Sequence, residues 1–195
     1  MFHHKNIRLQ RFNYVGRQRY FITLCCFERY PVFANPGRCT WLLDIFRAES
    51  VARFFAIHAY CIMPDHFHFL VKGQEVSSDL LEFVKSLKIK SSRLYQSETS
   101  QDLWQKKFFD HILRGHESPE SVAWYIWLNP VRKGLSAAIG EYLFAGSFTE
   151  LSRQLVSTPA SWTPPWETQC ARLGRRPLQP LTSHCAFSFF VLALI

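Results

Sequence analysis

The chain has 195 residues, enough for one domain with a hydrophobic core of its own. Lys and Arg outnumber Asp and Glu by 23 to 15, which gives a formal net charge of +8. This excess favours a polyanionic partner, with nucleic acid as the first candidate, although a merely basic protein would show it too. The sequence has no apolar window of about 20 residues, so we expect no membrane span.

The six cysteines show no Cys-x-x-Cys pair and no regular spacing, and several lie inside apolar runs. We therefore expect neither a disulfide framework nor a zinc-thiolate site, and we place the chain in a reducing compartment. The N-terminus lacks the apolar stretch of a secretory signal. Together these features predict a cytoplasmic protein.

The sequence divides into three parts. Residues 1–19 form a basic arm with no acidic residue before Glu28. Residues 20–150 alternate strand-like and helix-like patterns and are expected to form the catalytic domain. Residues 151–195 are irregular, hold five of the ten prolines and end in an apolar run, so we expect a C-terminal extension. Its last part, residues 171–195, is either a DNA-binding tail or a frameshifted or read-through terminus.

The predicted elements follow in chain order. Residues 20–27 form a strand, residues 40–54 a helix, and residues 55–62 and 66–71 a hairpin. A second helix starts after Ser78 or Asp79, a strand-like segment spans 103–114, and Ser118 begins a third helix. The order β-α-β-β-α-β-α predicts an α+β sandwich, with helices packed on a mainly antiparallel sheet.

Two histidines stand one residue apart in His66-Phe67-His68. Alternate residues of a strand share a face, so both imidazoles would point the same way, about 7 Å apart along the strand. Such a pair can bind one divalent metal ion. The alternative is a strand with two half-buried structural histidines.

Tyr125 and Asn129 are four residues apart and would share a face of the third predicted helix. If that helix packs beside the histidine strand, the four side chains converge. A tyrosine hydroxyl has a pKa near 10, so it attacks a phosphodiester only if something activates it. A bound metal could neutralise the developing charge. From spacing alone, Tyr125 could equally be an ordinary residue of an amphipathic helix.

Three segments in order, MPDHFHFLV, LWQKKFFDHILR and WYIWLNPVRKGL, resemble the REP-associated tyrosine transposases. These are single-tyrosine transposases of the HUH nuclease superfamily, and the similarity covers residues 7–150. The resemblance implies a ferredoxin-like fold and an enzyme of DNA transposition. It also implies that the enzyme cuts and rejoins single-stranded DNA, using Mg²⁺ or Mn²⁺.

The resemblance also implies residue roles. His66 and His68 match the paired metal ligands, and Asn129 stands where relatives place a polar residue that completes the metal site. Tyr125 matches the nucleophile that forms a 5′-phosphotyrosine. His111, in a segment that matches the family's Trp…Phe…His-x-x-Arg strand, is either a helper near the site or a packed histidine, and we favour packing.

The substrate implied by the resemblance is DNA with a hairpin beside the cleavage site, and a homodimer is plausible for the family. Relatives commonly carry a Gly-Gly pair before the first strand, where this chain has only Gly16, which leaves fine DNA specificity open. Basic side chains would gather the phosphates. These are Arg8, Arg11, Arg17, Arg19, Lys85, Lys88, Lys106, Lys107, Arg114, Arg132 and Lys133.

Two alternatives remain at this point. The basic face of the second helix is either simply solvated or in contact with phosphate. The whole protein is either the enzyme described above, a non-catalytic nucleic-acid-binding regulator on the same fold, or a metal-dependent hydrolase with no covalent step. The intact set of His66, His68, Tyr125 and Asn129 argues against the regulator.

Overall fold

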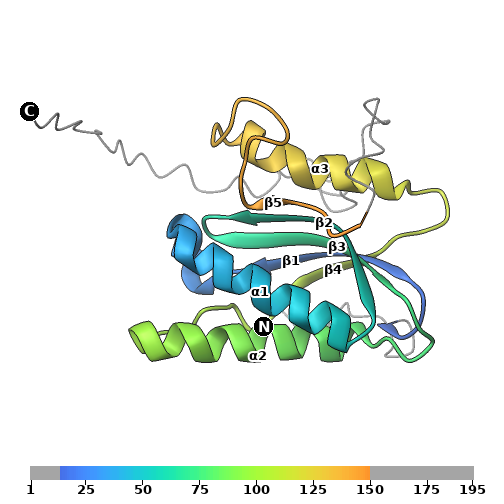
Figure 1. Ribbon diagram of the computed structural model, residues 1–195, viewed down its shortest axis with the longest axis horizontal. Coiled ribbons are helices and arrows are strands. Elements are labelled where there is room, and N and C mark those ends of the chain that lie inside the picture. Colours follow the sequence, from blue (N-terminus) through green and yellow to red (C-terminus); the bar gives the residue numbers. More distant parts are fainter. Residues whose placement is uncertain (1–13, 150–195) are drawn as a thin grey trace, which may run out of the picture. The chain divides into compact units, whose positions relative to one another are not determined.

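The structure is a computed structural model that describes residues 14–149 (Figure 1). These residues all belong to one compact unit of the chain. Arg8, Arg11, most of the predicted basic arm and the predicted C-terminal extension lie outside the described residues.

One antiparallel sheet forms the centre of this unit. Its strands are β1 (Arg19–Cys25), β2 (Phe55–Met63), β3 (His66–Gly73), β4 (Phe109–Ile112) and β5 (Ala145–Gly146). They lie in the order β4-β1-β3-β2-β5, and every neighbouring pair is antiparallel. The strand β3, which carries the paired histidines, is therefore central and hydrogen-bonded on both sides.

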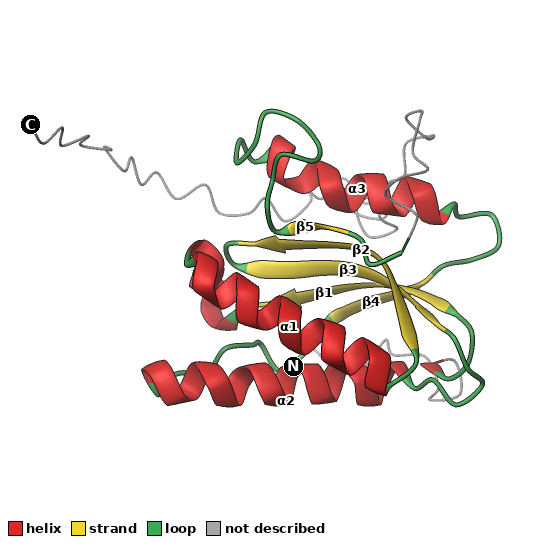
Figure 2. Ribbon diagram, in the orientation of Figure 1, coloured by secondary structure: helices red, strands yellow, loops and turns green. Residues whose placement is uncertain are grey.

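Helices cover both faces of the sheet (Figure 2). Helices α1 (Pro36–Ala52) and α2 (Leu80–Thr99) lie on one face, and α3 (Pro119–Arg132) lies on the other. Two short 3-10 turns, η2 (Phe27–Arg29) and η3 (Val32–Ala34), join β1 to α1. In the described part of the chain, no helix combines the length and apolar character needed to cross a membrane.

The first six regular elements, β1-α1-β2-β3-α2-β4, make the split βαβ arrangement of ferredoxin-like folds. The predicted α+β sandwich with a mainly antiparallel sheet is thus confirmed. Helix α3 is an addition to this core, and it covers the face that α1 and α2 leave open (Figure 1).

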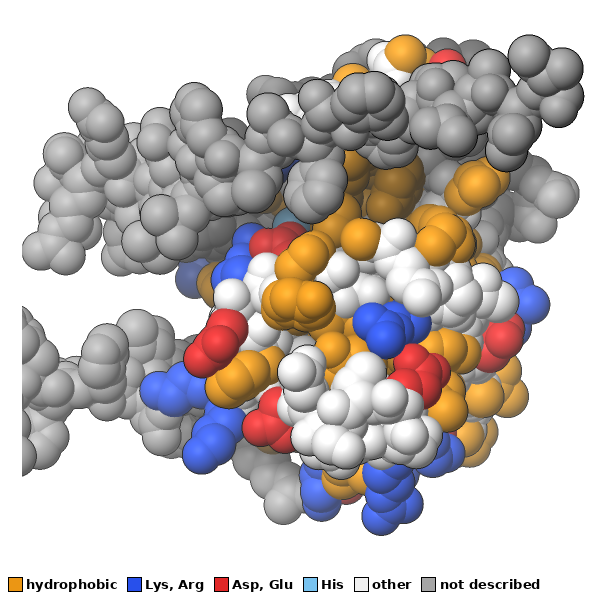
Figure 3. All heavy atoms as spheres, turned by 90° about the vertical axis from the view of Figure 1, so that its left-hand side faces the viewer, with side chains coloured by type: hydrophobic (Ala, Val, Ile, Leu, Met, Phe, Trp, Pro, Cys, Tyr) orange, Lys and Arg blue, Asp and Glu red, His pale blue; other side chains and the backbone are white. Residues whose placement is uncertain are grey.

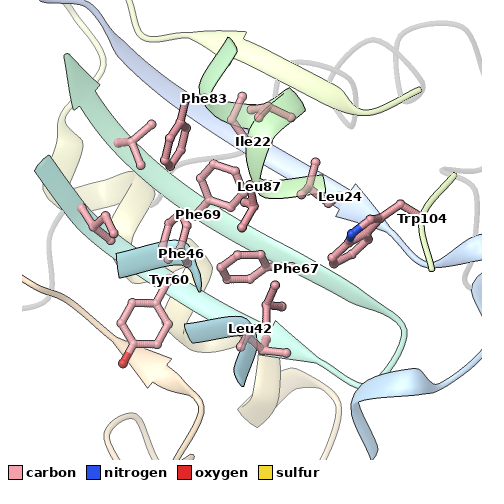
Figure 4. Close-up of a cluster of buried hydrophobic side chains, with 14 of the residues drawn as sticks. Ile22, Leu24, Leu42, Phe46, Tyr60, Phe67, Phe69, Phe83, Leu87 and Trp104 are labelled. Carbon is pink, nitrogen blue, oxygen red and sulfur yellow. The ribbon is translucent and has the colours of Figure 1, made fainter. Parts of the chain in front are cut away.

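The hydrophobic core lies between the sheet and helices α1 and α2 (Figure 4). Phe46 of α1 packs against Phe67 and Phe69 of β3, with ring centroids 4.9 Å apart in both cases. Phe83 of α2 completes the cluster at 5.8 Å from Phe46. All four rings are fully buried, so the odd-numbered residues of β3 anchor the strand from this side.

The helix starts follow the predicted capping pattern. The Asp79 carboxylate accepts hydrogen bonds from the backbone of Leu81 and Glu82, and the Ser118 hydroxyl accepts one from Ser121. Both contacts satisfy backbone N–H groups that a helix leaves unpaired at its first turn.

The bounds of two elements, and the presence of a third, differ from the prediction. Helix α1 begins at Pro36 rather than at residue 40, because Pro suits the first helical position and Asn35 caps the helix by accepting from Gly37. Within the predicted strand over 103–114, continuous pairing is limited to Phe109–Ile112, and Trp104 makes an isolated bridge with Cys26. In the segment before this strand, the Lys88 ammonium donates hydrogen bonds to the backbone carbonyls of residues 105 and 106. The two-residue β5 was not predicted, because a segment this short has no periodicity.

The core packing predicts a large loss of stability for Phe46→Ala. Removing a fully buried ring that touches several aromatic side chains should cost about 3–5 kcal/mol of unfolding free energy. Val51→Ala on the same helix is the control, because Val51 is 73% exposed and should change stability by less than about 0.5 kcal/mol. Urea unfolding measures both, and equal losses would contradict this packing.

Candidate active site

His66 and His68 project from β3 toward α3, whereas Phe67 and Phe69 project into the core. The two imidazole centroids are 4.5 Å apart with ring planes at 79°. The side chains are nearly buried, with 9% of His66 and 7% of His68 exposed. The predicted alternation along this strand is confirmed, and one strand serves both the core and the site.

Each imidazole is held at its Nδ1 atom by a neighbouring side chain. Thr23 Oγ1 of β1 lies 2.7 Å from His68 Nδ1, because Thr23 and His68 are cross-strand partners. Asp65 Oδ1 lies 2.5 Å from His66 Nδ1. The Nε2 atom of each ring is then the nitrogen left for a metal, and a hydrogen bond at the other nitrogen is the usual arrangement of metal-binding histidines.

The protonation states suit metal binding. Burial, with smaller contributions from His66 and Arg29, lowers the pKa of His68 well below its ordinary value, so this imidazole is neutral at pH 7. Burial alone would raise the pKa of Asp65. The hydrogen bond from His66 and the charges of His66 and Arg29 outweigh burial and lower that pKa, so Asp65 is a carboxylate. A neutral imidazole is the form that binds metals.

Tyr125 of α3 lies over the histidine face of the sheet. Its ring centroid is 6.3 Å from that of His68 and 6.0 Å from that of Phe21. The side chain is 8% exposed, and the Arg132 guanidinium stacks 5.1 Å from the ring centroid. The structure therefore brings together His66, His68 and Tyr125, as expected from a helix packed beside the histidine strand.

The side-chain amide of Asn129 makes hydrogen bonds to the backbone of its own helix, α3. Its Nδ2 atom donates to the backbone carbonyls of Tyr125, at 2.8 Å, and Ile126, at 3.3 Å. Pro130 has no N–H, so the Ile126 carbonyl lacks its regular helical donor and the Asn129 amide replaces it. Because carbonyl oxygens only accept hydrogen bonds, the amide atom that faces them is Nδ2, and Oδ1 is the atom left for a metal.

Within residues 14–149, no three His, Cys, Asp or Glu side chains are grouped so that they could hold a metal. A metal at this site would therefore take two imidazoles and complete its coordination with oxygen, from Asn129, water or a phosphate. Mg²⁺ and Mn²⁺ accept such oxygen ligands, so the residues present fit the ions that the sequence resemblance implied.

Two other histidines, His111 and His58, have structural surroundings. His111 Nε2 on β4 lies 2.9 Å from both carboxylate oxygens of Glu117, and Glu117 Oε2 also accepts from the Arg114 backbone N–H. This contact ties β4 to the loop before α3 and agrees with our preference for a packed His111. His58 Nδ1 lies 3.4 Å from Thr149 Oγ1, and its Nε2 is buried without a partner.

Four of the cations predicted to bind DNA are solvent-exposed and lie at the two ends of α3. Arg132 and Lys133 stand at its C-terminal end. Arg19 and Arg114 line a hollow formed with the first residues of the helix. These four share the side of the sheet that carries the candidate site.

The cations on the α2 side do not join them. Lys85 pairs with Glu82 at 3.4 Å, and Lys88 donates to two backbone carbonyls, so both have partners within the chain. Lys106 lines a groove along α2 together with Lys85 and Lys88, and the neighbouring Lys107 is exposed. Since α2 covers the face opposite α3, Lys85, Lys88 and Lys106 lie across the sheet from Tyr125 (Figure 1).

Charge is mixed rather than segregated at the end of the molecule seen in Figure 3. Basic and acidic side chains alternate there with exposed hydrophobic ones. Arg17, another predicted DNA contact, pairs with Glu75 at 3.5 Å. This end of the molecule therefore offers DNA individual cations rather than one continuous basic surface.

Sequence reasoning missed the residues that orient the histidines. Thr23 is one polar residue within an apolar strand, and only the β1–β3 register places it opposite His68. Asp65 lies in the turn between β2 and β3. Its position next to His66 was the one available signal, because a carboxylate there can reach the imidazole of the following residue.

Fold and site together define an α+β protein with a His-x-His strand beneath a tyrosine-bearing helix. Residues 14–128, more than half of the chain, match the family described as "Transposase IS200 like". The chain therefore belongs to this transposase family. The membership supports a DNA-processing enzyme with a role in DNA transposition.

Curated relatives and a solved structure agree with this assignment. The chain is 24% identical over 110 residues to the REP-associated tyrosine transposase of Escherichia coli (strain K12), covering 56% of this chain and 64% of the relative. It is 26% identical over 167 residues to an uncharacterized Haemophilus influenzae protein, covering 66% and 89% of the two chains. The resemblance seen in the sequence is thus confirmed.

A REP-associated tyrosine transposase bound to a REP hairpin has the same fold, with a TM-score of 0.62 at 19% identity. The match covers 82% of this chain and 92% of that one. The ferredoxin-like fold that the resemblance implied is therefore observed in this chain and shared with a solved transposase.

The contacts of Asn129 predict a structural effect that needs no metal. Asn129→Ala should lower the unfolding free energy by about 1 kcal/mol, because the Ile126 carbonyl loses its donor. In a Pro130→Ala background, the new backbone N–H at position 130 can serve that carbonyl, and the same substitution should cost less. A double-mutant cycle in EDTA measures this, and additive losses would contradict the replacement of one donor by the other.

Burial of neutral His68 predicts acid sensitivity. The folded pKa lies below the unfolded value of about 6.5, so the unfolded state binds more protons as the pH falls through 6.5, and stability declines. His68→Gln should reduce the difference in unfolding free energy between pH 7 and pH 5, measured by urea unfolding in EDTA. His116→Gln, at an exposed position, is the control and should leave the difference unchanged.

Proposed function

We propose that this protein cuts and rejoins single-stranded DNA through a covalent tyrosine intermediate. The observation that carries the proposal is the convergence of His66, His68 and Tyr125 from β3 and α3. The His68 ring centroid lies 4.5 Å from that of His66 and 6.3 Å from that of Tyr125. Membership of a transposase family gives the reaction class, and the geometry supports the assignment of its residues.

In the proposed reaction, the Tyr125 hydroxyl oxygen attacks the phosphorus of a phosphodiester. The new bond is Tyr125 Oη–P, and the bond to the 3′ oxygen breaks. The phenol proton passes to solvent, and the 3′ oxygen takes up a proton to become a hydroxyl. The product is a 5′-phosphotyrosine. Attack by another 3′ hydroxyl on this phosphotyrosine reverses the chemistry, rejoins DNA and frees Tyr125.

The chain's residues supply position and charge. His66 and His68 present their Nε2 atoms, and Asn129 presents Oδ1, for the divalent ion. Mg²⁺ or Mn²⁺ bound there would polarise the phosphodiester and offset the charge of its transition state. Arg132, whose guanidinium stacks on the Tyr125 ring, is placed to contact a phosphate beside the nucleophile.

The proposed substrate is single-stranded DNA beside a hairpin. The solved relative that shares the fold is bound to a REP hairpin, and the named relative is a REP-associated tyrosine transposase. Arg19, Arg114, Arg132 and Lys133 lie on the same side of the sheet as Tyr125 and are the described cations best placed to hold the cleaved strand. Their contacts would make binding weaken as salt rises.

Tyr125→Phe tests the nucleophile. The purified protein is mixed with Mn²⁺ and labelled hairpin DNA from the repeats that flank the gene, and products are separated on a denaturing gel. The wild type should give a covalent protein–DNA band, and Tyr125→Phe should remove it while leaving DNA binding within about twofold. Tyr30→Phe is the matched control, since Tyr30 is 61% exposed on the turn after β1. A band that persists in Tyr125→Phe would overturn the assignment.

The alternatives give other outcomes in the same assay. Binding with neither adduct nor cleavage, over several flanking hairpins, would indicate a non-catalytic regulator. Cleavage without an adduct would indicate a metal-dependent hydrolase. His66→Ala should abolish cleavage at all Mn²⁺ concentrations that support the wild type, and unchanged cleavage would place the metal elsewhere.

A further inference from the structure

The turn that follows β1 packs against the turn that precedes His66. The Cys26 backbone N–H donates to the Asp65 carbonyl at 2.9 Å, and the Phe33 N–H donates to the Pro64 carbonyl at 2.9 Å. Segments about 40 residues apart in sequence are thereby joined at the end of the sheet where the candidate metal site lies.

One side chain crosses this junction. Arg29 Nε lies 2.9 Å from Asp65 Oδ2, while the other carboxylate oxygen, Oδ1, lies 2.5 Å from His66 Nδ1. Arg29 Nη1 also donates to Cys25 Sγ at 3.0 Å, and Cys25 is the cross-strand neighbour of His66. The result is a continuous chain of contacts from Arg29 through Asp65 to the imidazole.

The backbone of this turn is in an uncommon conformation. Glu28 and Arg29 have φ values of 51° and 60°, although neither is glycine. Left-handed conformations of such residues are disfavoured and persist where surrounding contacts hold them in place. Here the Asp65 and Cys25 contacts of Arg29 are the side-chain contacts that fix the turn.

We propose that Asp65 and Arg29 are positioning residues that set the divalent-cation affinity of the site through His66. Asp65 holds the Nδ1–H of His66, which leaves Nε2 bare and makes it a better donor to a cation, and Arg29 holds Asp65 in place. This inference rests on the proposed metal site but not on DNA cleavage, because it concerns cation binding by the free protein.

The two imidazoles differ in their supports. His68 is held by a neutral hydroxyl, Thr23 Oγ1, whereas His66 is held by a carboxylate that is paired with a cation. Changes at Asp65 should therefore affect the His66 ring and leave the His68 ring in its native orientation. The same asymmetry allows the two histidines to be compared within one protein.

The test titrates Mn²⁺ into the full-length, metal-free protein without DNA and follows free Mn²⁺ by electron paramagnetic resonance. Asp65→Ala should raise the Kd for Mn²⁺ about 10- to 100-fold. Asp65→Asn should recover part of the loss because the amide oxygen still accepts from Nδ1, and Arg29→Gln should raise the Kd several-fold. Arg38→Gln is the matched control, since it breaks a comparable Arg–carboxylate pair, 3.2 Å from Glu98, away from the site.

A second readout separates positioning from general loss of structure. In ¹⁵N NMR of histidine-labelled, metal-free protein, His66 should be the Nδ1–H tautomer, and Asp65→Ala should shift it to a mixture while His68 keeps its own tautomer. An unchanged Kd and tautomer in Asp65→Ala would overturn the proposal, as would a wild type that does not bind Mn²⁺. If the metal effects appear but no covalent adduct forms, the proposed function fails and this inference stands.

Discussion

The site depends on the packing of β3 between two layers of helices. Phe67 and Phe69 are fixed by Phe46 and Phe83 on one side, and this forces His66 and His68 to the other side. Because the side chains of a strand alternate strictly, the hydrophobic core determines the direction in which the two histidines point. A shift of β3 by one residue would turn the histidines into the aromatic core and the phenylalanines toward α3.

Helix α3 provides the second half of the arrangement. It lies on the face that α1 and α2 leave uncovered, and its Tyr125 contacts both Phe21 of β1 and His68 of β3. Near the end of this helix, Pro130 has no N–H for the Ile126 carbonyl, and the Asn129 amide donates to that carbonyl instead. Asn129, which resembles a family metal ligand, thus also stabilises the helix one turn beyond the tyrosine. It does so through Nδ2, whereas the proposed metal contact would use Oδ1 of the same amide.

Much of the fold followed from the sequence, because strand alternation and helix caps are local signals. The face shared by His66 and His68 needed only the two-residue period, and Ser118-Pro119 marked the start of α3. The orienting contacts were not predictable in this way. Thr23 reaches His68 only through the strand register, and Arg29 reaches Asp65 only through a left-handed turn that no local residue pattern specifies. The contacts of the α2 lysines were not predictable either, because helical periodicity shows a polar face but not the backbone carbonyls to which Lys88 donates.

The most direct test of the account is to locate the DNA on the protein. The covalent product formed with flanking hairpin DNA would be digested with nuclease and protease, and the modified peptide would be sequenced by tandem mass spectrometry. The account predicts a nucleotide phosphate attached to Tyr125, in the peptide derived from α3. A nucleotide on any other residue, or reaction products with no modified peptide, would contradict it.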